Sequence, residues 1–421
     1  MIKIAVIGFG VVGSGVVHVL HNNTESIMQN AGQEISVKYI LDIAEFPESQ
    51  YSFLFIKDFE TIVTDPEITV VVEAIGGVGA ALDYTRRSLE AGKNVVTSNK
   101  ELVAEHGSEL LRLAMEKGVN YLFEASVGGG IPIVRPIIQC MTANIISEIY
   151  GILNGTTNYI LTDMEKNSAD FSDSLLEAQK KGYAEADPTA DIEGHDTCRK
   201  ICILSSLAFG RHVFPKQVPT KGITGVTIDD MRFAATLGYK IKLLGRARVV
   251  GDKLSAYVAP HLVGNHNLLA TVDNVMNGVA IRGNAVGKVV FCGAGAGKLP
   301  TASAVVADVI DAVKHLHTRR WISWTDDSDN FISDCALLES AWYIRTNSSR
   351  EKVEKEFGNV IFADEIGADE SGTDEICTTE TGVEMGAETA FITGVMSGKK
   401  IDDLLERGVT ACSCFRVLGD Y

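Results

Sequence analysis

The chain has 421 residues, of which 46% are hydrophobic and 22% charged, and its formal net charge is −17. This composition is typical of globular proteins and excludes collagen and coiled coils, while the acidic balance disfavours nucleic acid and membrane surfaces as partners. The apolar runs are shorter than the roughly 18 residues of a membrane span, and eight cysteines in so long a chain, without a signal-peptide pattern, predict a reduced, cytoplasmic protein.

Strands and helices are predicted to alternate through the first 124 residues. The expected strands are 2–7, 37–42, 70–74, 94–97 and 119–124, and the expected helices are 14–20, 80–91 and 101–117. Gly92 and Gly118 follow the last two helices, at the position where helices commonly end. This alternation is typical of a parallel sheet covered by helices on both faces, and it predicts an α/β fold.

The middle of the chain mixes helical and strand-like segments. In chain order we expect a helix that begins at Pro132, a strand at 150–153, helices at 155–165, 172–181 and 195–209, strand-like structure over 241–263, and a helix at 301–315. The proline suits the first turn of a helix, because the N–H that it lacks would have no partner there.

The last 80 residues predict a separate small unit. The expected order is a strand at 341–345, a helix at 350–356, strands at 359–363 and 391–395, a helix at 401–406 and a strand at 412–418. A polar, acidic loop is expected at 367–375. The order βαββαβ is that of a ferredoxin-like unit.

A glycine motif joins the first strand to the first helix. It reads Gly8-Phe9-Gly10-Val11-Val12-Gly13. Glycines in this context allow a tight turn, a close approach of the backbone to a pyrophosphate, and close packing of helix on strand. The motif therefore predicts a dinucleotide site, and the alternative is an ordinary tight turn of an α/β sheet.

The acidic residue expected at the end of the second strand is Asp42. A carboxylate there would accept hydrogen bonds from both ribose hydroxyls and would repel a 2′-phosphate. This favours NAD over NADP. Either Lys38 or Lys57 could nevertheless fold back towards such a phosphate, so both cofactors stay open.

The segment around the start of the predicted helix at 195–209 carries the most chemically active side chains. Asp196 and Lys200 are four residues apart and therefore share one face of this helix. That face continues into apolar residues as far as Leu207, so we expect the pair to point inward. A lysine beside an apolar wall is suited to proton transfer near neutral pH. The alternative is a solvent-exposed ion pair.

Several ordered motifs within residues 1–320 make the chain resemble the homoserine dehydrogenase family. They are the glycine motif and the segments 92–100, 123–132, 151–159, 182–200 and 293–303. The resemblance implies NAD(P)-linked interconversion of L-homoserine and L-aspartate 4-semialdehyde, on the biosynthetic route to threonine, methionine and isoleucine.

The resemblance also implies roles for individual residues. Lys200 would transfer the proton, and Lys100 would lie between the nicotinamide and the substrate. The implied substrate-binding residues are Asp196, Glu185, Asp191, Gly155 and Thr156. The implied cofactor-binding residues are those of the glycine motif together with Asp42, Thr97, Ser98, Lys100, Gly182, Glu185 and Gly297. For Lys100, the spacing alone leaves open an exposed lysine at a helix start.

A monovalent cation such as sodium is a further implication of the resemblance. Members of this family fold a glycine-rich turn around the ion, and backbone carbonyls are suitable ligands for a hard cation. The candidate ligands are Glu124, Val127, Gly129 and Ile131. A turn that simply needs glycine is the alternative.

The implied architecture has three parts. A Rossmann-type domain at 1–130, completed by a returning helix at about 301–318, precedes an α+β catalytic and dimerisation domain at 131–325 and an ACT-like unit at 335–421. The ACT-like unit departs from its family pattern after Arg345, where the usual ligand-binding turn is replaced by the segment 346–351. We therefore expect a degenerate module that helps assembly without sensing threonine. The resemblance implies a homodimer or homotetramer.

Two other functions compete with this interpretation. One is a related amino-acid dehydrogenase or reductase with a different semialdehyde. The other is a catalytically silent nucleotide sensor whose output is the ACT-like tail. The set of Lys200, Asp196 and Glu185 argues against the sensor, because a silent binder needs no matched acid and base.

Overall fold

The computed structural model describes residues 1–318, 322–326, 331–366 and 388–419. The chain forms two compact units, each assembled from several segments. Unit 1 comprises Met1–Leu153, Cys198–Val218 and Met276–Phe331, and unit 2 comprises Asn154–Thr197, Pro219–Val275 and Ile332–Tyr421. The polar loop predicted at 367–375 lies outside the described residues.

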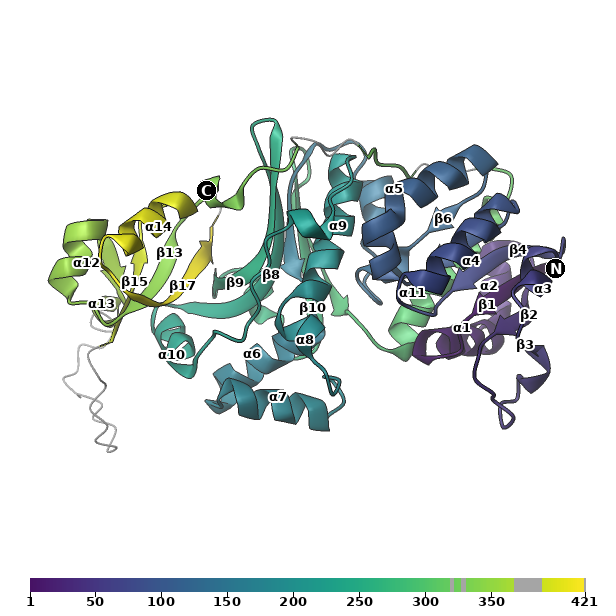
Figure 1. The fold of residues 1–421 in the computed structure, drawn as a ribbon, viewed down its shortest axis with the longest axis horizontal. Coiled ribbons are helices and arrows are strands. Elements are labelled where there is room, and N and C mark those ends of the chain that lie inside the picture. Colours follow the sequence, from purple (N-terminus) through teal and green to yellow (C-terminus); the bar gives the residue numbers. More distant parts are fainter. Residues whose placement is uncertain (319–321, 327–330, 367–387, 420–421) are drawn as a thin grey trace. The chain divides into compact units, whose positions relative to one another are not determined.

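Unit 1 contains the predicted N-terminal parallel sheet (Figure 1). Its strands are β1 (Ile2–Ile7), β2 (Ile35–Leu41), β3 (Phe55–Ile56), β4 (Ile68–Glu73), β5 (Asn94–Thr97) and β6 (Tyr121–Leu122). They pair in parallel in the order β3-β2-β1-β4-β5-β6. The Rossmann-type sheet is thereby confirmed. The strand expected at 119–124 is shorter, because the chain turns into a 3₁₀-helix at Glu124–Ser126.

The helices of this part of unit 1 are α1 (Val11–Asn22), α2 (Thr24–Ala31), α3 (Glu60–Val63), α4 (Gly79–Glu90), α5 (Lys100–Lys117) and α11 (Lys298–Lys314). The returning helix α11 packs closely on α1, since a Cβ on Gly15 would lie 2.8 Å from the carbonyl oxygen of Lys298. The sequence did not predict α2, which occupies part of the polar stretch between β1 and β2.

The remainder of unit 1 contains the antiparallel strands β7 (Ile146–Ile152), β10 (Met276–Gly283) and β11 (Gly287–Ala294) in the order β11-β10-β7. The helix expected from Pro132 is largely replaced by a π-helical turn at Pro136–Cys140. A second proline at the first position of that turn removes another N–H from the helical ladder. The helix α9 (His195–Phe209) begins in unit 2 and continues in unit 1.

Unit 2 begins with the helices α6 (Gly155–Asn167), α7 (Phe171–Lys180) and α8 (Thr189–Ile192). It continues with α10 (Ile228–Thr236) and with a long antiparallel hairpin of β8 (Tyr239–Val250) and β9 (Lys253–Gly264). The hairpin explains the strand-like pattern of the sequence at 241–263.

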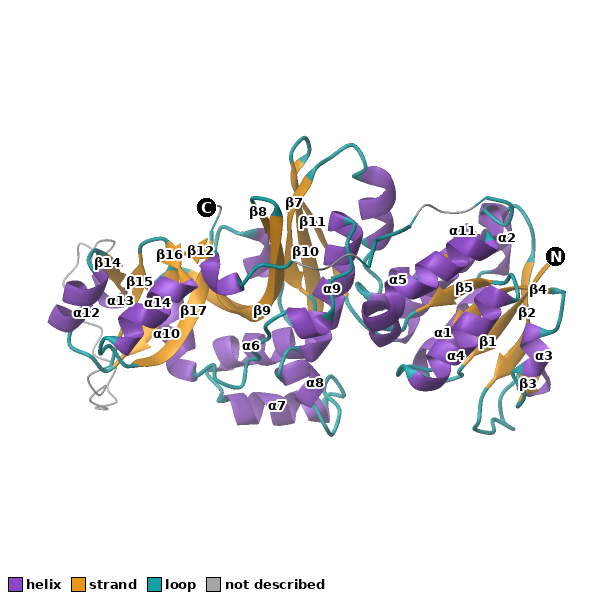
Figure 2. Ribbon diagram, turned by 45° about the horizontal axis from the view of Figure 1, so that its top comes forward, coloured by secondary structure: helices purple, strands orange, loops and turns teal. Residues whose placement is uncertain are grey.

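The C-terminal part of unit 2 has the predicted element order (Figure 2). Its main elements are β13 (Trp342–Thr346), α12 (Arg350–Phe357), β14 (Val360–Phe362), β15 (Thr389–Thr393), α14 (Gly398–Glu406) and β17 (Ala411–Leu418). The short elements β12 (Glu339–Ser340), α13 (Ala363–Ile366) and β16 (Met396–Ser397) accompany them. The strands lie in the order β17-β13-β15-β14, and β17 also pairs in parallel with β9. This part therefore shares one compact unit with the hairpin; its ACT-like character stays a prediction.

Alternate residues of β13 serve opposite faces of this sheet. Trp342 and Ile344 join the apolar core formed with α12 and α14. On the other face, the hydroxyl of Tyr343 and Nε of Arg345 donate to Oδ1 of Asp230 in α10, at 3.1 and 2.8 Å. The buried carboxylate thus fixes α10 on the sheet.

Throughout the described residues, no helix combines the length and apolarity needed to cross a bilayer.

Candidate active site

The glycine motif forms a cradle in which two glycines are required by geometry. Gly8 has φ +94°, a left-handed conformation that side chains disfavour. A Cβ on Gly13 would lie 1.9 Å from the carbonyl oxygen of Gly8, so α1 can start this close to β1 because position 13 has no side chain. Gly10 has open space where a Cβ would stand. The cradle fits a dinucleotide pyrophosphate, which needs close approach to the backbone here.

A cavity of about 400 Å³ opens directly beside this cradle. Its lining residues are Ile7, Gly8, Gly10, Leu41, Asp42, Ile43, Lys57, Ala74, Ile75, Ala80 and Tyr84. Its volume is within the range of small-molecule sites. It joins the carboxyl ends of β1, β2 and β4, where ligands of parallel sheets bind.

Asp42 has a structural function in this cavity. Its Oδ2 accepts a hydrogen bond from the N–H of Phe9 at 2.6 Å, and its Oδ1 accepts one from the N–H of Ala44 at 2.8 Å. The carboxylate therefore holds the glycine motif while it lines the cavity. The two lysines differ: Lys57 lines the same cavity, whereas Nζ of Lys38 is 2.5 Å from Asp65.

The first turn of α5 places Lys100 next to a well-defined helix cap. The side chain of Asn99 accepts a hydrogen bond from the N–H of Leu102 at 3.1 Å, which fixes the start of the helix. Ser98 is half-buried, but Thr97 is fully buried, so the Thr97 hydroxyl lies inside the domain.

Lys200 is buried, as the sequence predicts. Its residue is 8% exposed, and its Nζ donates to the carbonyl oxygen of Leu153 at 2.8 Å. The adjacent Arg199 pairs with Glu101 of α5 at 2.8 Å. Lys200 and Lys100 thus belong to helices joined within unit 1. The alternative of a solvent-exposed pair is wrong for Lys200, and also for Asp196, which is 3% exposed.

Asn154 is a site residue that the sequence analysis missed. Its Nδ2 donates to Oδ1 of Asp191 at 2.7 Å and to Oδ2 of Asp196 at 2.9 Å. Its Oδ1 accepts from the N–H of Thr157 at 2.8 Å and so caps α6. One amide therefore brings together two of the three predicted substrate-binding carboxylates. The signal was present in the motif 151–159, because asparagine is a preferred cap before a helix.

The other predicted site residues of unit 2 lie on the first turn of α6 and in the loop after α7. A Cβ on Gly155 would lie 2.7 Å from the carbonyl oxygen of Val275, and the hydroxyl of Thr156 donates to the carbonyl oxygen of Tyr183 at 2.7 Å. Gly182 follows α7 with φ +73°, and Glu185 is exposed in the next loop. The loop that carries Glu185 is thus tied to the first turn of α6.

The predicted cation turn is held from inside by Glu124. Its carboxylate accepts hydrogen bonds at 2.6 to 2.8 Å from three successive N–H groups, those of Ile133, Val134 and Arg135. Because the carboxylate is engaged with these N–H groups, the backbone carbonyl of Glu124 is the better candidate for the predicted cation role. No group of three or more His, Cys, Asp or Glu side chains suited to a metal occurs among the described residues. That finding does not concern backbone ligands.

The glycine-rich segment of residues 293–297 packs against this turn. A Cβ on Gly129 would lie 2.3 Å from the carbonyl oxygen of Gly295, and the N–H of Gly130 donates to Ala294 at 2.9 Å. Gly297, with φ +117°, precedes α11 and is exposed. Val127 and Ile131, the remaining candidate ligands, are buried in the turn.

Asp308 of α11 secures the turn from the helix side. It accepts a hydrogen bond from the N–H of Glu124 at 2.8 Å and pairs with the guanidinium of Arg135. Burial raises the pKa of Asp308 to about 7, against the opposing effect of Arg135. This cluster fixes the backbone of the predicted cation turn.

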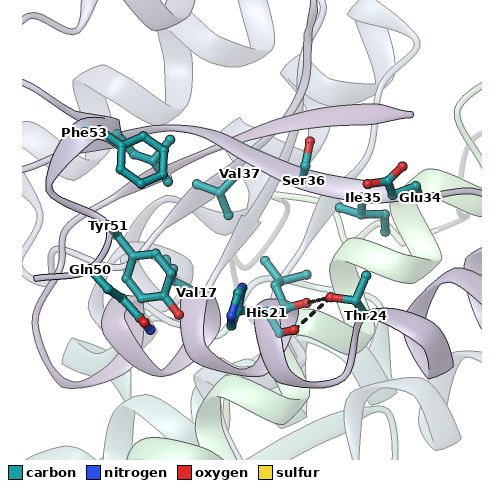
Figure 3. Close-up of a pocket in the computed structure, with 12 residues that line it drawn as sticks. Val17, His21, Thr24, Glu34, Ile35, Ser36, Val37, Gln50, Tyr51 and Phe53 are labelled. Atoms are coloured by element: carbon teal, nitrogen blue, oxygen red, sulfur yellow. Dashed lines mark hydrogen bonds between the residues drawn. The ribbon is translucent and has the colours of Figure 1, made fainter.

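A separate cavity of about 400 Å³ lies between α1, β2 and residues 50–54 (Figure 3). Its lining includes His21, Ser36, Tyr51 and Phe53, and it contains none of the residues predicted to bind cofactor or substrate. We assign no function to it.

Family models match most of the chain. The model described as "Homoserine dehydrogenase, NAD binding domain" matches residues 8–124, and the model described as "Homoserine dehydrogenase" matches residues 132–310. The first range contains the glycine cradle and Lys100. The second contains Asn154, Asp196 and Lys200.

Individual relatives agree with the family models. A homoserine dehydrogenase of Neisseria gonorrhoeae is 44% identical over 315 residues, which are 74% of this chain and 72% of that protein. One of Pseudomonas aeruginosa is 42% identical over 82% of this chain and 81% of its own length. The solved homoserine dehydrogenase of Thiobacillus denitrificans is 34% identical, with a TM-score of 0.84 over 99% of this chain and 98% of that one. The chain therefore belongs to the homoserine dehydrogenase family.

Proposed function

We propose that the chain oxidises L-homoserine to L-aspartate 4-semialdehyde, and catalyses the reverse reaction, with NAD or NADP, in the biosynthesis of threonine, methionine and isoleucine. The observation that carries this proposal is the buried amine of Lys200 in the unit that also contains the glycine cradle. The pairing of Arg199 with Glu101 ties the helix of Lys200 to the helix that Lys100 begins.

Each predicted side chain has a role that its chemistry suits. The dinucleotide, when bound, supplies the hydride acceptor for alcohol oxidation. Lys200 removes the proton of the substrate hydroxyl and returns it in the reverse reaction. Asp196 holds the hydroxyl, with its orientation fixed by Asn154. Lys100 binds on the nicotinamide side of the substrate.

The substrate amino group is assigned to carboxylates of unit 2. Glu185 and Asp191 supply negative charge, which an ammonium requires. Asp191 is fixed by Asn154 at 2.7 Å, whereas Glu185 lies on an exposed loop. The turn of Gly155 and Thr156 completes this part of the site.

For the cofactor, NAD is proposed to bind better than NADP. The support is the carboxylate of Asp42, which lines the cavity beside the cradle. Lys57 lines the same cavity and would moderate the repulsion of a 2′-phosphate. A homoserine dehydrogenase from a hyperthermophilic archaeon, 26% identical to this chain with a TM-score of 0.62, was solved with NADPH.

A sodium or other monovalent cation is proposed at the turn of residues 124–131. The support is the rigid backbone of this turn, fixed by the carboxylates of Glu124 and Asp308.

We further propose a cytoplasmic homodimer or homotetramer. The acidic composition and the free cysteines among the described residues support that location.

The direct test follows the absorbance of reduced nicotinamide with purified protein, L-homoserine and either NAD or NADP. Rapid oxidation of homoserine, with L-serine and L-threonine as poor substrates, is the expected result. Protein that binds reduced dinucleotide but oxidises none of the three would contradict the proposal and favour the silent sensor. Oxidation of another amino-acid alcohol in preference would favour the related dehydrogenase.

A further inference from the structure

A buried glutamate that was not among the predicted site residues directly precedes Ala74 and Ile75, which line the cavity beside the glycine cradle. Glu73 is the last residue of β4 and is 0% exposed. Its Oε1 accepts a hydrogen bond from the N–H of Ile75 at 2.9 Å, and its Oε2 accepts one from the hydroxyl of Thr97 at 2.5 Å. Burial raises the pKa of Glu73. A charged group in such surroundings depends on these donors.

The hydrogen bonds continue from Thr97 into α5 and back to the cavity wall. The hydroxyl oxygen of Thr97 accepts from the N–H of Asn99 at 2.9 Å. Nδ2 of Asn99 then donates to the carbonyl oxygen of Gly77 at 2.6 Å, while its Oδ1 caps α5. Since Ile75 and Gly77 belong to the same loop, the bonds close a ring from Glu73 through Thr97 and Asn99 to that loop.

The loop of residues 74–78 contains two consecutive glycines, which have no side chains that could define its shape. Gly76 and Gly77 have φ +73° and +67° and are exposed. Glycines in sequence lose much conformational freedom when they are ordered. The loop nevertheless approaches the glycine cradle closely, since a Cβ on Gly8 would lie 2.8 Å from the carbonyl oxygen of Ala74. Its position therefore affects the shape of the cradle. Ala74 and Ile75 line the cavity beside the cradle.

We infer that Glu73, Thr97 and Asn99 are positioning residues of the dinucleotide site. They hold the loop of residues 74–78 against the glycine cradle and fix the helix turn that Lys100 begins. They act through the loop and the helix start rather than by touching the ligand. This inference deepens the proposed function and rests on it. It reassigns the Thr97 side chain from a cofactor contact to the support beneath one.

The test compares three variants with the wild-type full chain. Thr97→Val keeps the side-chain shape but removes the hydroxyl that links Glu73 to Asn99, whereas Thr97→Ser keeps that hydroxyl. Thr85→Val is the matched control, because the hydroxyl of Thr85 is also buried in unit 1 and has no hydrogen-bond partner among the described residues. The probe is NADH, and its dissociation constant is measured from fluorescence without substrate.

The dissociation constant of NADH should rise about tenfold in Thr97→Val, since a broken buried hydrogen bond amounts to roughly that factor. It should stay within about twofold in Thr97→Ser and in Thr85→Val, because both keep the ring. Equal binding by Thr97→Val and wild type would overturn the inference. Equal weakening in Thr97→Ser or Thr85→Val would do the same, because it would show a general packing effect.

A second variant keeps the inference testable if Thr97→Val does not fold. Asn99→Asp retains an oxygen to cap α5 but loses the donor to Gly77, so it should also weaken NADH binding about tenfold. Wild-type affinity in this variant would contradict the ring. Binding of NADH needs no turnover, so a wild-type protein that binds NADH without oxidising homoserine would refute the proposed reaction and leave this inference standing.

Discussion

The glycine turn after β1 and the start of α9 present different kinds of group to a ligand. At the turn, backbone forms much of the surface, and the side chain of Asp42 both supports this backbone and lines the cavity beside it. At the start of α9, the charged side chains themselves are the candidate reacting groups, and both are buried. Substitutions in the glycine turn should therefore change the room for the ligand and the shape of the backbone. Substitutions at the start of α9 should instead change proton transfer.

The largest expected effect is at the helix. Lys200→Met keeps the length and apolar stem of the side chain but removes the amine, so kcat for homoserine should fall by about a thousandfold. The affinity for the dinucleotide should stay within about threefold, since the glycine cradle is formed by the backbone between β1 and α1 and not by Lys200. Steady-state kinetics and NADH fluorescence measure the two quantities. The exposed Lys253→Met is the control, and parallel loss of kcat and affinity in Lys200→Met would mean a structural role.

Next in size is a pair of substitutions in the glycine turn. Gly13→Ala should destabilise the protein by about 2 kcal/mol, because its Cβ meets the carbonyl oxygen of Gly8 at 1.9 Å. Gly10→Ala should leave stability unchanged but weaken NADH binding about tenfold, because its Cβ would occupy the approach of the pyrophosphate. Urea denaturation and fluorescence titration distinguish the two. A stable Gly13→Ala would mean that the turn is less closely packed.

A smaller change is expected from the side chain that supports the turn. Asp42→Asn removes a negative charge from the cavity and should raise the ratio of kcat/KM for NADP to that for NAD about tenfold. Affinity for both cofactors should fall slightly, because one amide oxygen cannot accept from both Phe9 and Ala44. The exposed Glu48→Gln serves as control. An unchanged ratio would show that this carboxylate does not select the cofactor.

The smallest effect is expected away from both regions. Millimolar L-threonine should not change turnover, because the turn after β13 uses its polar groups internally. The hydroxyl of Thr346 donates to the carbonyl oxygen of Thr410 at 2.7 Å, and the N–H of Ser348 donates back to Thr346 at 3.0 Å. Initial rates with and without threonine test this. Strong inhibition would restore a sensing role to the C-terminal unit.

Much of the fold was predictable because glycine and apolar runs mark the elements of a parallel sheet clearly. The predicted strands at 2–7 and 94–97 and the helix at 195–209 have the observed bounds. The helix α2 was missed because most of its residues are polar and it buries only Ile27 and Ala31. The grouping of the C-terminal strands with the hairpin was also missed, because the pairing of β17 with β9 joins residues more than 150 positions apart.

The site divides in the same way. The burial of Lys200 and Asp196 could be predicted because four-residue spacing on a helix is a local signal. Glu73 is a single acidic residue at the end of an apolar strand, and its partner Thr97 is 24 positions away. Asn154 links carboxylates 37 and 42 positions downstream. Such long-range hydrogen bonds leave no periodic pattern in a sequence.

The interleaving of the two units has a consequence for synthesis on the ribosome. Unit 1 needs α11 against α1, and α11 begins at residue 298. The nascent N-terminal sheet must therefore wait, with one side of α1 uncovered, until the residues of α11 have been translated. A chain released before that point would expose the apolar surface of α1, and chaperones and proteases recognise such surfaces.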